Sequence, residues 1–291
     1  MKVVCFEHNR ARKIGVIDED HVVDIASVDN RVSHDVGALL VAVEGELSRL
    51  KAVVAKAKSS DRMPLSSIKY ALPISSSSRI ICLGLNYLEH LKEGRLRDTS
   101  PQHPSIFMRI PSSFVAQGED LVRHKASEQF DYEGELVAYV GKPAKYMTME
   151  NALSCISGYS CGNEGTVRDF QRHTTQWGMG KNFDRSGSIG PWIVDAKELP
   201  PGGKGLRLET RRNGTVMQSD STSSMMFPLA ETIVYLTKGI QLLPGDIIFT
   251  GTPSGVGAAR KPEPVWLKSG DRLEIEIEGV GLLQNRVVDV K

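Results

Sequence analysis

An acidic segment that alternates with apolar residues, Asp131 to Gly141, most constrains how this chain can fold. The alternation predicts a β-strand, in which successive side chains point to opposite faces and Asp131, Glu133 and Glu135 share one face. Carboxylates two residues apart lie roughly 6–7 Å apart at the backbone, so their oxygens can converge on one cation. The segment therefore predicts a strand that carries either a solvated acidic face or a site for Mg²⁺ or Mn²⁺.

Alternation alone does not separate these two interpretations. Residues 273–278, Leu-Glu-Ile-Glu-Ile-Glu, alternate just as regularly. A strand of this kind is usually half buried, with its acidic side chains in water. The choice between a metal site and a solvated face therefore depends on other parts of the sequence.

Composition and charge exclude several classes of protein. The chain has 291 residues, of which 40% are hydrophobic, and its net charge is +1. This balance gives no reason to expect nucleic acid as a partner, and no apolar stretch approaches the roughly 18–20 residues that span a bilayer. The first residues do not resemble a secretory signal, and the four cysteines lack zinc-type spacing. We expect a cytoplasmic protein with reduced thiols.

The chain divides into a small N-terminal module, residues 1–74, and a larger unit, residues 75–291. The module is expected to contain a hairpin around residues 18–20 and a helix that Ser33 caps and Gly45 weakens. A serine run at residues 75–78 is interpreted as a flexible linker. Strand signals dominate the larger unit, at residues 79–84, 104–108, 135–140, 190–194, 246–250 and 273–277, with helices expected at 87–92, 150–153, 166–171 and 227–237. The fold class predicted is α+β and rich in β-strands.

Other segments of the larger unit carry residues suited to acid–base chemistry. His90 and Glu93 are three residues apart on an expected helix, so the carboxylate can orient the imidazole. Glu164 lies at a glycine-flanked turn and can add a third carboxylate to the acidic strand. Lys181 can present an ammonium group to an anionic substrate. Each also has an ordinary alternative: a surface ion pair, an acid at the start of a helix, and a solvated lysine.

These segments, taken in order, resemble the fumarylacetoacetate hydrolase family. The likeness covers roughly residues 79–291. It is carried by residues 84–90 (Gly-Leu-Asn-Tyr, then His90), 131–135 (Asp-Tyr-Glu-Gly-Glu), 158–171 (Gly-Tyr to Arg-Asp-Phe-Gln), 180–183 (Gly-Lys-Asn-Phe), 190–192 (Gly-Pro-Trp) and 250–257 (Thr-Gly-Thr-Pro-Ser-Gly-Val-Gly). The resemblance implies a mixed β-roll with peripheral helices, which forms a homodimer.

The resemblance also implies a catalytic site. It assigns a Mg²⁺ or Mn²⁺ ion, with Ca²⁺ as a further option, to Glu133, Glu135 and Glu164. The ion chelates the 2-oxo-acid end of a substrate, and a pair formed by His90 and Glu93 activates a water molecule that attacks a carbonyl carbon.

Further residues are assigned to the substrate in the same way. The family lysine, here Lys181, stabilises the departing enolate. Arg109 is expected to bind a substrate carboxylate. The loop formed by Thr250, Gly251 and Thr252 matches family residues near that carboxylate.

Two departures from the family pattern bear on this assignment. The family usually has Asn-Asp where this chain has Asn163 and Glu164, and the longer side chain changes how the third ligand reaches the ion. The segment at residues 184–189 also differs from the common family wording, so it leaves the identity of the substrate open.

The function expected first is metal-dependent hydrolysis of a C–C bond in a β-diketo acid of the acylpyruvate type. Two alternatives stay open: decarboxylation or isomerisation of a related 2-oxo dicarboxylate at the same site, and a non-catalytic family member with a weakened metal site. We also expect Glu133→Ala to lose the metal without unfolding.

Overall fold

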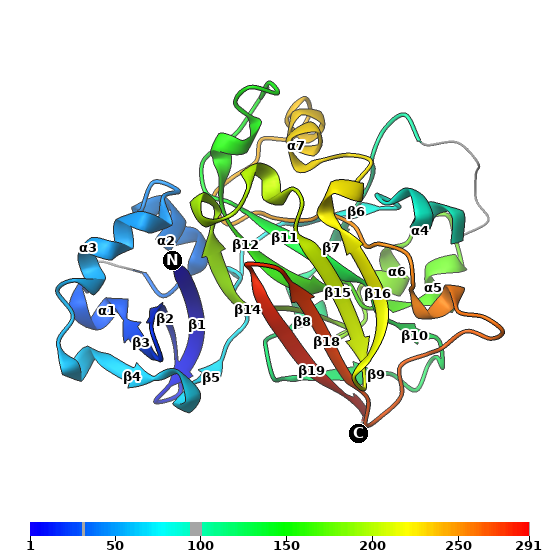
Figure 1. Cartoon of the computed structure of the whole chain (residues 1–291), viewed down its shortest axis with the longest axis horizontal. Helices are drawn as coiled ribbons and strands as arrows, with labels where there is room; N and C mark the ends of the chain where they lie inside the picture. The colour runs from blue at the N-terminus through cyan, green and yellow to red at the C-terminus, as the bar shows by residue number, and fades with distance from the viewer. Residues whose placement is uncertain (31–32, 94–100, 291) are drawn as a thin grey trace.

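The computed structural model describes residues 1–30, 33–93 and 101–290. Its described part is a mixed α+β fold in which strands predominate, as the sequence predicted (Figure 1). A long mixed sheet packs against a second, five-stranded sheet, and the helices lie at the periphery. No helix among the described residues has the length and apolar character needed to cross a membrane.

The large sheet has twelve strands, ten of them in the order β4-β3-β2-β1-β14-β12-β11-β17-β6-β7, with β5 paired to β1 and β8 to β14. Neighbours are antiparallel except the pairs β17–β6 and β14–β8. The bounds are β1 Lys2–His8, β2 Ala11–Asp18, β3 His21–Asp24, β4 Arg62–Pro64, β5 Lys69–Tyr70, β6 Ile80–Gly84, β7 Ser105–Arg109, β8 Phe114–Val115, β11 Gly134–Val140, β12 Ile156–Asn163, β14 Gly187–Asp195 and β17 Ile247–Phe249.

The second sheet has the order β16-β15-β18-β19-β9, and two short strands, β10 and β13, form a separate pair. Its strands are β9 Asp120–Arg123, β15 Arg207–Arg212, β16 Thr215–Ser221, β18 Arg272–Ile277 and β19 Gly281–Asp289, and the separate pair is β10 Phe130–Asp131 with β13 Thr166–Val167. The α-helices are α1 Ile25–Val28, α2 Val36–Ala42, α3 Lys51–Val54, α4 Leu88–Glu93, α5 Arg168–Arg172, α6 Gly178–Lys181 and α7 Leu229–Thr237. The helix expected at residues 150–153 is instead a 3₁₀ turn, Ala152–Cys155.

The N-terminal segment continues the large sheet. The expected hairpin is present as β2 and β3, and β1 pairs with β14, so backbone hydrogen bonds join this segment to the rest of the sheet. The helix expected from Ser33 begins later, because the Asp35 carboxylate accepts the N–H of Ala38 and caps α2. Gly45, at φ +72°, interrupts the helical segment as predicted. The division between residues 74 and 75 stays a prediction.

The serine run at residues 75–78, which composition suggested is a flexible linker, forms a hydrogen-bonded turn anchored at both of its ends. The Ser78 hydroxyl accepts the N–H of Ser75 at 3.0 Å and donates to the carbonyl of Gly245 at 2.6 Å. Both serines are buried. A run of hydroxyl side chains thus closes a turn through hydrogen bonds that a composition-based interpretation does not foresee.

Strand β11 is buried on both faces, so of the two interpretations of the acidic segment the solvated face is not the one observed. Leu136 and Ala138 pack in a cluster that includes residues of the second sheet. Val137 and Tyr139 point the other way and pack with residues of β1, β2 and α2. Because protein covers both faces, the acidic side chains at the start of this strand are withdrawn from bulk water.

Candidate metal centre and pocket

Three buried carboxylates converge at the N-terminal end of β11. Glu133, Glu135 and Glu164 each offer an oxygen, and these three oxygens lie within 4.8 Å of one another. The side chains come from two separate segments, as the family resemblance implied. The side chain of Glu164 is longer than that of the aspartate usual in the family. Glu164 nevertheless belongs to the carboxylate group.

The β11–β12 ladder explains this convergence. Glu135 lies opposite Gly162, and Gly134 lies opposite Asn163 at the end of the pairing. Beyond the ladder, the N–H of Glu164 donates to the carbonyl of Glu133 at 2.8 Å, and the side-chain oxygen of Asn163 accepts the N–H of Glu133 at 3.1 Å. These bonds hold the two segments together just past the ordered strands.

Two buried cations lie against this cluster. The Lys181 ammonium is 2.7 Å from Glu133 Oε2 and 3.0 Å from Glu164 Oε2. Arg168 lies 2.7 Å from Glu133 and also 2.7 Å from Asp131. Asp131 is not a member of the carboxylate group, because its oxygens accept from Arg168 and from the N–H groups of Gly257 and Ala258.

The donor set fits a hard divalent cation. Glu135 Oε1 and Glu164 Oε1 are buried, and neither has a hydrogen-bond partner among the described residues. A buried carboxylate oxygen without a partner is costly, and a cation ligated by oxygens removes that cost. Glu133, Glu135 and Glu164 are therefore the residues that would hold Mg²⁺ or Mn²⁺ here.

The three carboxyl groups have very different proton affinities. Burial, and repulsion from Glu164 and Glu133, raise the pKa of Glu135 well above its usual range. Burial also raises the pKa of Glu164, although Lys181 opposes this. Burial raises the pKa of Glu133 too, but the charges of Lys181 and Arg168 outweigh it, so the net pKa is well below the usual range.

These shifts predict that Mn²⁺ affinity rises with pH. A carboxyl group with a raised pKa keeps its proton above about pH 4.5, where ordinary carboxyl groups are ionised, and the incoming cation must displace that proton. We expect calorimetric titrations in buffers of different ionisation enthalpy to detect proton release, and we expect affinity to keep increasing with pH above the range in which ordinary carboxyl groups ionise. Constant affinity without proton release above that range would contradict the raised pKa values.

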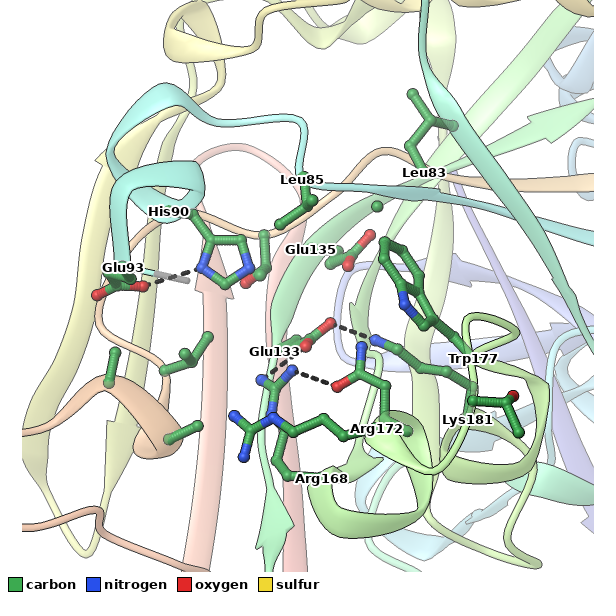
Figure 2. Close-up of a pocket in the computed structure, with 17 residues that line it drawn as sticks. Leu83, Leu85, His90, Glu93, Glu133, Glu135, Arg168, Arg172, Trp177 and Lys181 are labelled. Carbon is green, nitrogen blue, oxygen red and sulfur yellow. Dashed lines mark hydrogen bonds and ion pairs between the residues drawn. The ribbon is translucent and has the colours of Figure 1, made fainter. Parts of the chain in front are cut away.

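A cavity of about 300 Å³ opens beside the carboxylates, and Figure 2 shows its lining. His90 Nδ1 is 2.9 Å from Glu93 Oε2, and the N–H of Gly255 donates to Glu93 Oε1 at 2.7 Å. Because Glu93 is hydrogen-bonded to Nδ1 of His90, the second ring nitrogen, Nε2, is the one left for interactions with a ligand. The cavity is of a size that suits a small molecule, at the low end of the about 300–1,000 Å³ typical of ligand sites.

The four residues expected to bind substrate differ in their placement. Thr252 lines the cavity, but Arg109, Thr250 and Gly251 do not. The Thr250 hydroxyl donates to the carbonyl of Leu136, and the N–H of Gly251 donates to Glu135 Oε2 at 2.6 Å. These two residues therefore fix β11 and one carboxylate, a supporting position that the sequence did not indicate.

Arg109, which was expected to bind a substrate carboxylate, differs most clearly from its expected placement. Its guanidinium donates to the carbonyl of Gly165 at 3.2 Å and to the hydroxyls of Ser186 and Ser113 at 2.8 and 3.2 Å. It also lies 4.2 Å from the ring centre of Phe114 and is only 3% exposed. With its donors used inside the protein, Arg109 is not placed to bind a substrate carboxylate.

Sequence reasoning missed part of the cavity wall. Gln171, Arg172 and Trp177 all line it. The first two follow Arg168 on α5, where helical spacing and the family-like Arg-Asp-Phe-Gln segment were the available signals. Nothing in the local sequence indicates Trp177.

The ion pairs around Glu133 change what its alanine variant should do. Glu133→Ala removes the partner that Lys181 and Arg168 share, so each buried cation keeps only one of its two carboxylate partners. We expect the metal-free variant to lose about 3–5 kcal/mol of unfolding free energy, measured by urea denaturation. Glu276→Ala, in a half-exposed ion pair with Arg211, is the control and should change stability little. An unchanged urea midpoint for Glu133→Ala would contradict the expected loss of stability.

Comparisons with known proteins show the family and agree with the fold. The fumarylacetoacetate hydrolase C-terminal family model matches residues 79–288. Oxaloacetate tautomerase YisK of Bacillus subtilis (strain 168) is 39% identical over 225 residues, which cover 77% of this chain and 74% of that protein. Mitochondrial oxaloacetate tautomerase FAHD2A of Bos taurus is 36% identical over 228 residues, which cover 78% and 71%. The expected cytoplasmic location therefore remains only a prediction.

A solved structure matches along the whole chain. Fumarylacetoacetate hydrolase from the psychrophilic bacterium Exiguobacterium antarcticum is 32% identical, with a TM-score of 0.85, and the match covers 100% of both chains. The match includes the N-terminal strands, so that structure and this one share the arrangement of both the N-terminal segment and the larger unit.

Proposed function

Because the chain belongs to the fumarylacetoacetate hydrolase family, we propose that it is a divalent-cation-dependent enzyme that interconverts the keto and enol forms of a 2-oxo acid of the oxaloacetate type. The observation that carries the proposal is a single cavity lined by the His90–Glu93 pair and by two of the three clustered carboxylates, Glu133 and Glu135. The two relatives named as oxaloacetate tautomerases support this choice among the family activities.

Tautomerisation moves one proton between carbon and oxygen. Glu93 orients His90 through Nδ1, so Nε2 can take the proton from the carbon next to the 2-oxo group and pass it to the 2-oxo oxygen, and the conversion of enol to keto reverses both transfers. Gly255 fixes Glu93 in turn, which keeps the imidazole in one orientation. The pair thus performs the proton transfer without needing a water molecule as reactant.

Charge in the cavity wall favours the enolate that proton removal creates. Lys181 places a buried ammonium group beside Glu133 and Glu164, where it can offset negative charge that develops on a substrate oxygen. A divalent cation at the three carboxylates supplies Lewis-acid stabilisation of the same oxygen when it is bound.

Hydrolysis of a C–C bond is the second candidate. The same His90–Glu93 pair can take a proton from water instead of carbon, and the Exiguobacterium antarcticum protein is named as a hydrolase. That alternative is the one the sequence favoured first. A homodimeric assembly, expected from the resemblance, is proposed for either activity.

One experiment separates these activities. The Mn²⁺-loaded protein is supplied with the enol form of oxaloacetate, and its conversion is followed by ultraviolet absorbance. A set of acylpyruvates is tested in parallel for pyruvate release, and oxaloacetate for CO₂ release. Accelerated loss of the enol without pyruvate or CO₂ supports the proposal. Pyruvate release from an acylpyruvate, without enol conversion, would instead establish hydrolysis.

A further inference from the structure

The cations that line the cavity are not equally available to a ligand. Lys181 contacts Glu133 and Glu164, and Arg168 contacts Asp131 and Glu133. Both are almost fully buried and already neutralised by protein carboxylates. A substrate carboxylate that approached either one would have to compete with a protein carboxylate at short range.

Arg172 differs from both. It lies at the C-terminal end of α5, its side chain is exposed, and it lines the cavity. In Figure 2 it extends from the same helix as Arg168, on the side of the cavity away from Leu83 and Leu85. Its guanidinium has no hydrogen bond or ion pair to any other residue that the structure describes. It is thus the one lining arginine whose donors remain free within the described part of the chain.

The acidic residues that line the cavity do not neutralise the positive charge of Arg172. Glu133 is held by Arg168 and Lys181, and Glu93 is held by His90 and the N–H of Gly255. Glu135 accepts the N–H of Gly251. The cavity therefore has two distinct features. One is a carboxylate cluster that suits a cation, and the other is the guanidinium of Arg172, whose charge no lining carboxylate neutralises.

We propose that Arg172 binds the second carboxylate of a 2-oxo dicarboxylate and so selects dicarboxylates over monocarboxylates. This inference rests on the proposed function, in which the 2-oxo-acid end of the substrate is held at the cation. A guanidinium can form two parallel hydrogen bonds to a carboxylate, which gives it orientation as well as charge. Arg172 thereby replaces Arg109 as the arginine that binds the substrate carboxylate.

The test compares two acids that differ only in the group to be recognised. Oxaloacetate and 2-oxobutanoate share a four-carbon chain, and only oxaloacetate has the second carboxylate. Enolisation of both is measured as deuterium uptake at the carbon next to the 2-oxo group, by NMR, with Mn²⁺ present. The proteins compared are the wild type, Arg172→Gln, Arg172→Lys and the control Arg286→Gln, which removes an exposed arginine of β19 outside the cavity.

We expect Arg172→Gln to raise KM for oxaloacetate about tenfold, with kcat and the kinetics of 2-oxobutanoate little changed. Arg172→Lys should keep part of the preference, because it keeps the charge but not the paired hydrogen bonds. Arg286→Gln should behave as the wild type. Equal effects of Arg172→Gln on both acids, or no effect on either, would overturn the inference.

A binding measurement keeps this test separate from the proposed function. Calorimetry with the Mn²⁺-loaded protein compares 2-oxoglutarate with 2-oxopentanoate, a second pair of equal chain length. If the wild type enolises neither four-carbon acid, the proposed function fails. Tighter binding of 2-oxoglutarate that Arg172→Gln abolishes would still support the role of Arg172, and equal binding of the two five-carbon acids would contradict it.

Discussion

Replacing Glu135 with glutamine is expected to lower Mn²⁺ affinity at least about a hundredfold and to abolish cation-dependent turnover. Glu135 Oε1 is buried and has no hydrogen-bond partner among the described residues. The amide removes the negative charge that a cation needs and directs two hydrogens toward the remaining carboxylates. Its oxygen can still accept the N–H of Gly251, which now donates to Glu135 Oε2.

The metal-free Glu135→Gln variant should be at least as stable as the wild type. Burial and the neighbouring carboxylates already disfavour the charged form of Glu135, so a neutral side chain of the same shape relieves repulsion. Calorimetry with Mn²⁺ measures the affinity, and thermal unfolding in a chelator measures the stability. Undiminished Mn²⁺ affinity in this variant would remove Glu135 from the metal centre.

Glu276→Gln provides the matched control. Glu276 lies on β18, in the alternating segment that could not be distinguished from the acidic segment by sequence. Its carboxylate contacts Arg211 at 2.8 Å, and its side chain is 39% exposed. We expect this variant to bind Mn²⁺ as the wild type does, because the second sheet, unlike the end of β11, leaves the carboxylate partly in water.

These two strands show what the sequence could and could not determine. Alternation predicted β18 and most of β11, since it depends on the local geometry of the chain, but Tyr132 and Glu133 lie outside the strands and Asp131 belongs to the separate strand β10. It did not reveal that other elements cover both faces of β11, because burial depends on segments distant in sequence. The converging carboxylates were found through the family resemblance, whose motifs carry that distant information.

The arginines show the same limit within the site. Residue type does not distinguish Arg109 from Arg172, and the family resemblance favoured the first as a substrate ligand. The structure buries Arg109 against Phe114 and satisfies its donors with hydroxyl and carbonyl oxygens, whereas Arg172 stays exposed at the cavity. Which of two arginines remains free depends on the partners that folding brings to each, and residue type does not specify those partners.

Replacing His90 with glutamine is expected to lower kcat by about a hundredfold to ten-thousandfold while Mn²⁺ affinity stays unchanged. The imidazole is the group in the cavity that Glu93 and Gly255 hold in position for proton transfer. Glutamine keeps polar atoms near the same place but cannot take up a proton at neutral pH. His90 is not one of the three carboxylate ligands, so metal binding should not depend on it.

Deuterium uptake by oxaloacetate measures the loss of turnover, and calorimetry measures Mn²⁺ binding in the same protein samples. His8→Gln, at the exposed end of β1, is the control for a histidine replacement far from the cavity. Glu93→Gln should show a smaller loss than His90→Gln, because it weakens the orientation of the imidazole without removing the base. Turnover that survives unchanged in His90→Gln would show that the proton is transferred by another group, and the proposed reaction would then lack its base.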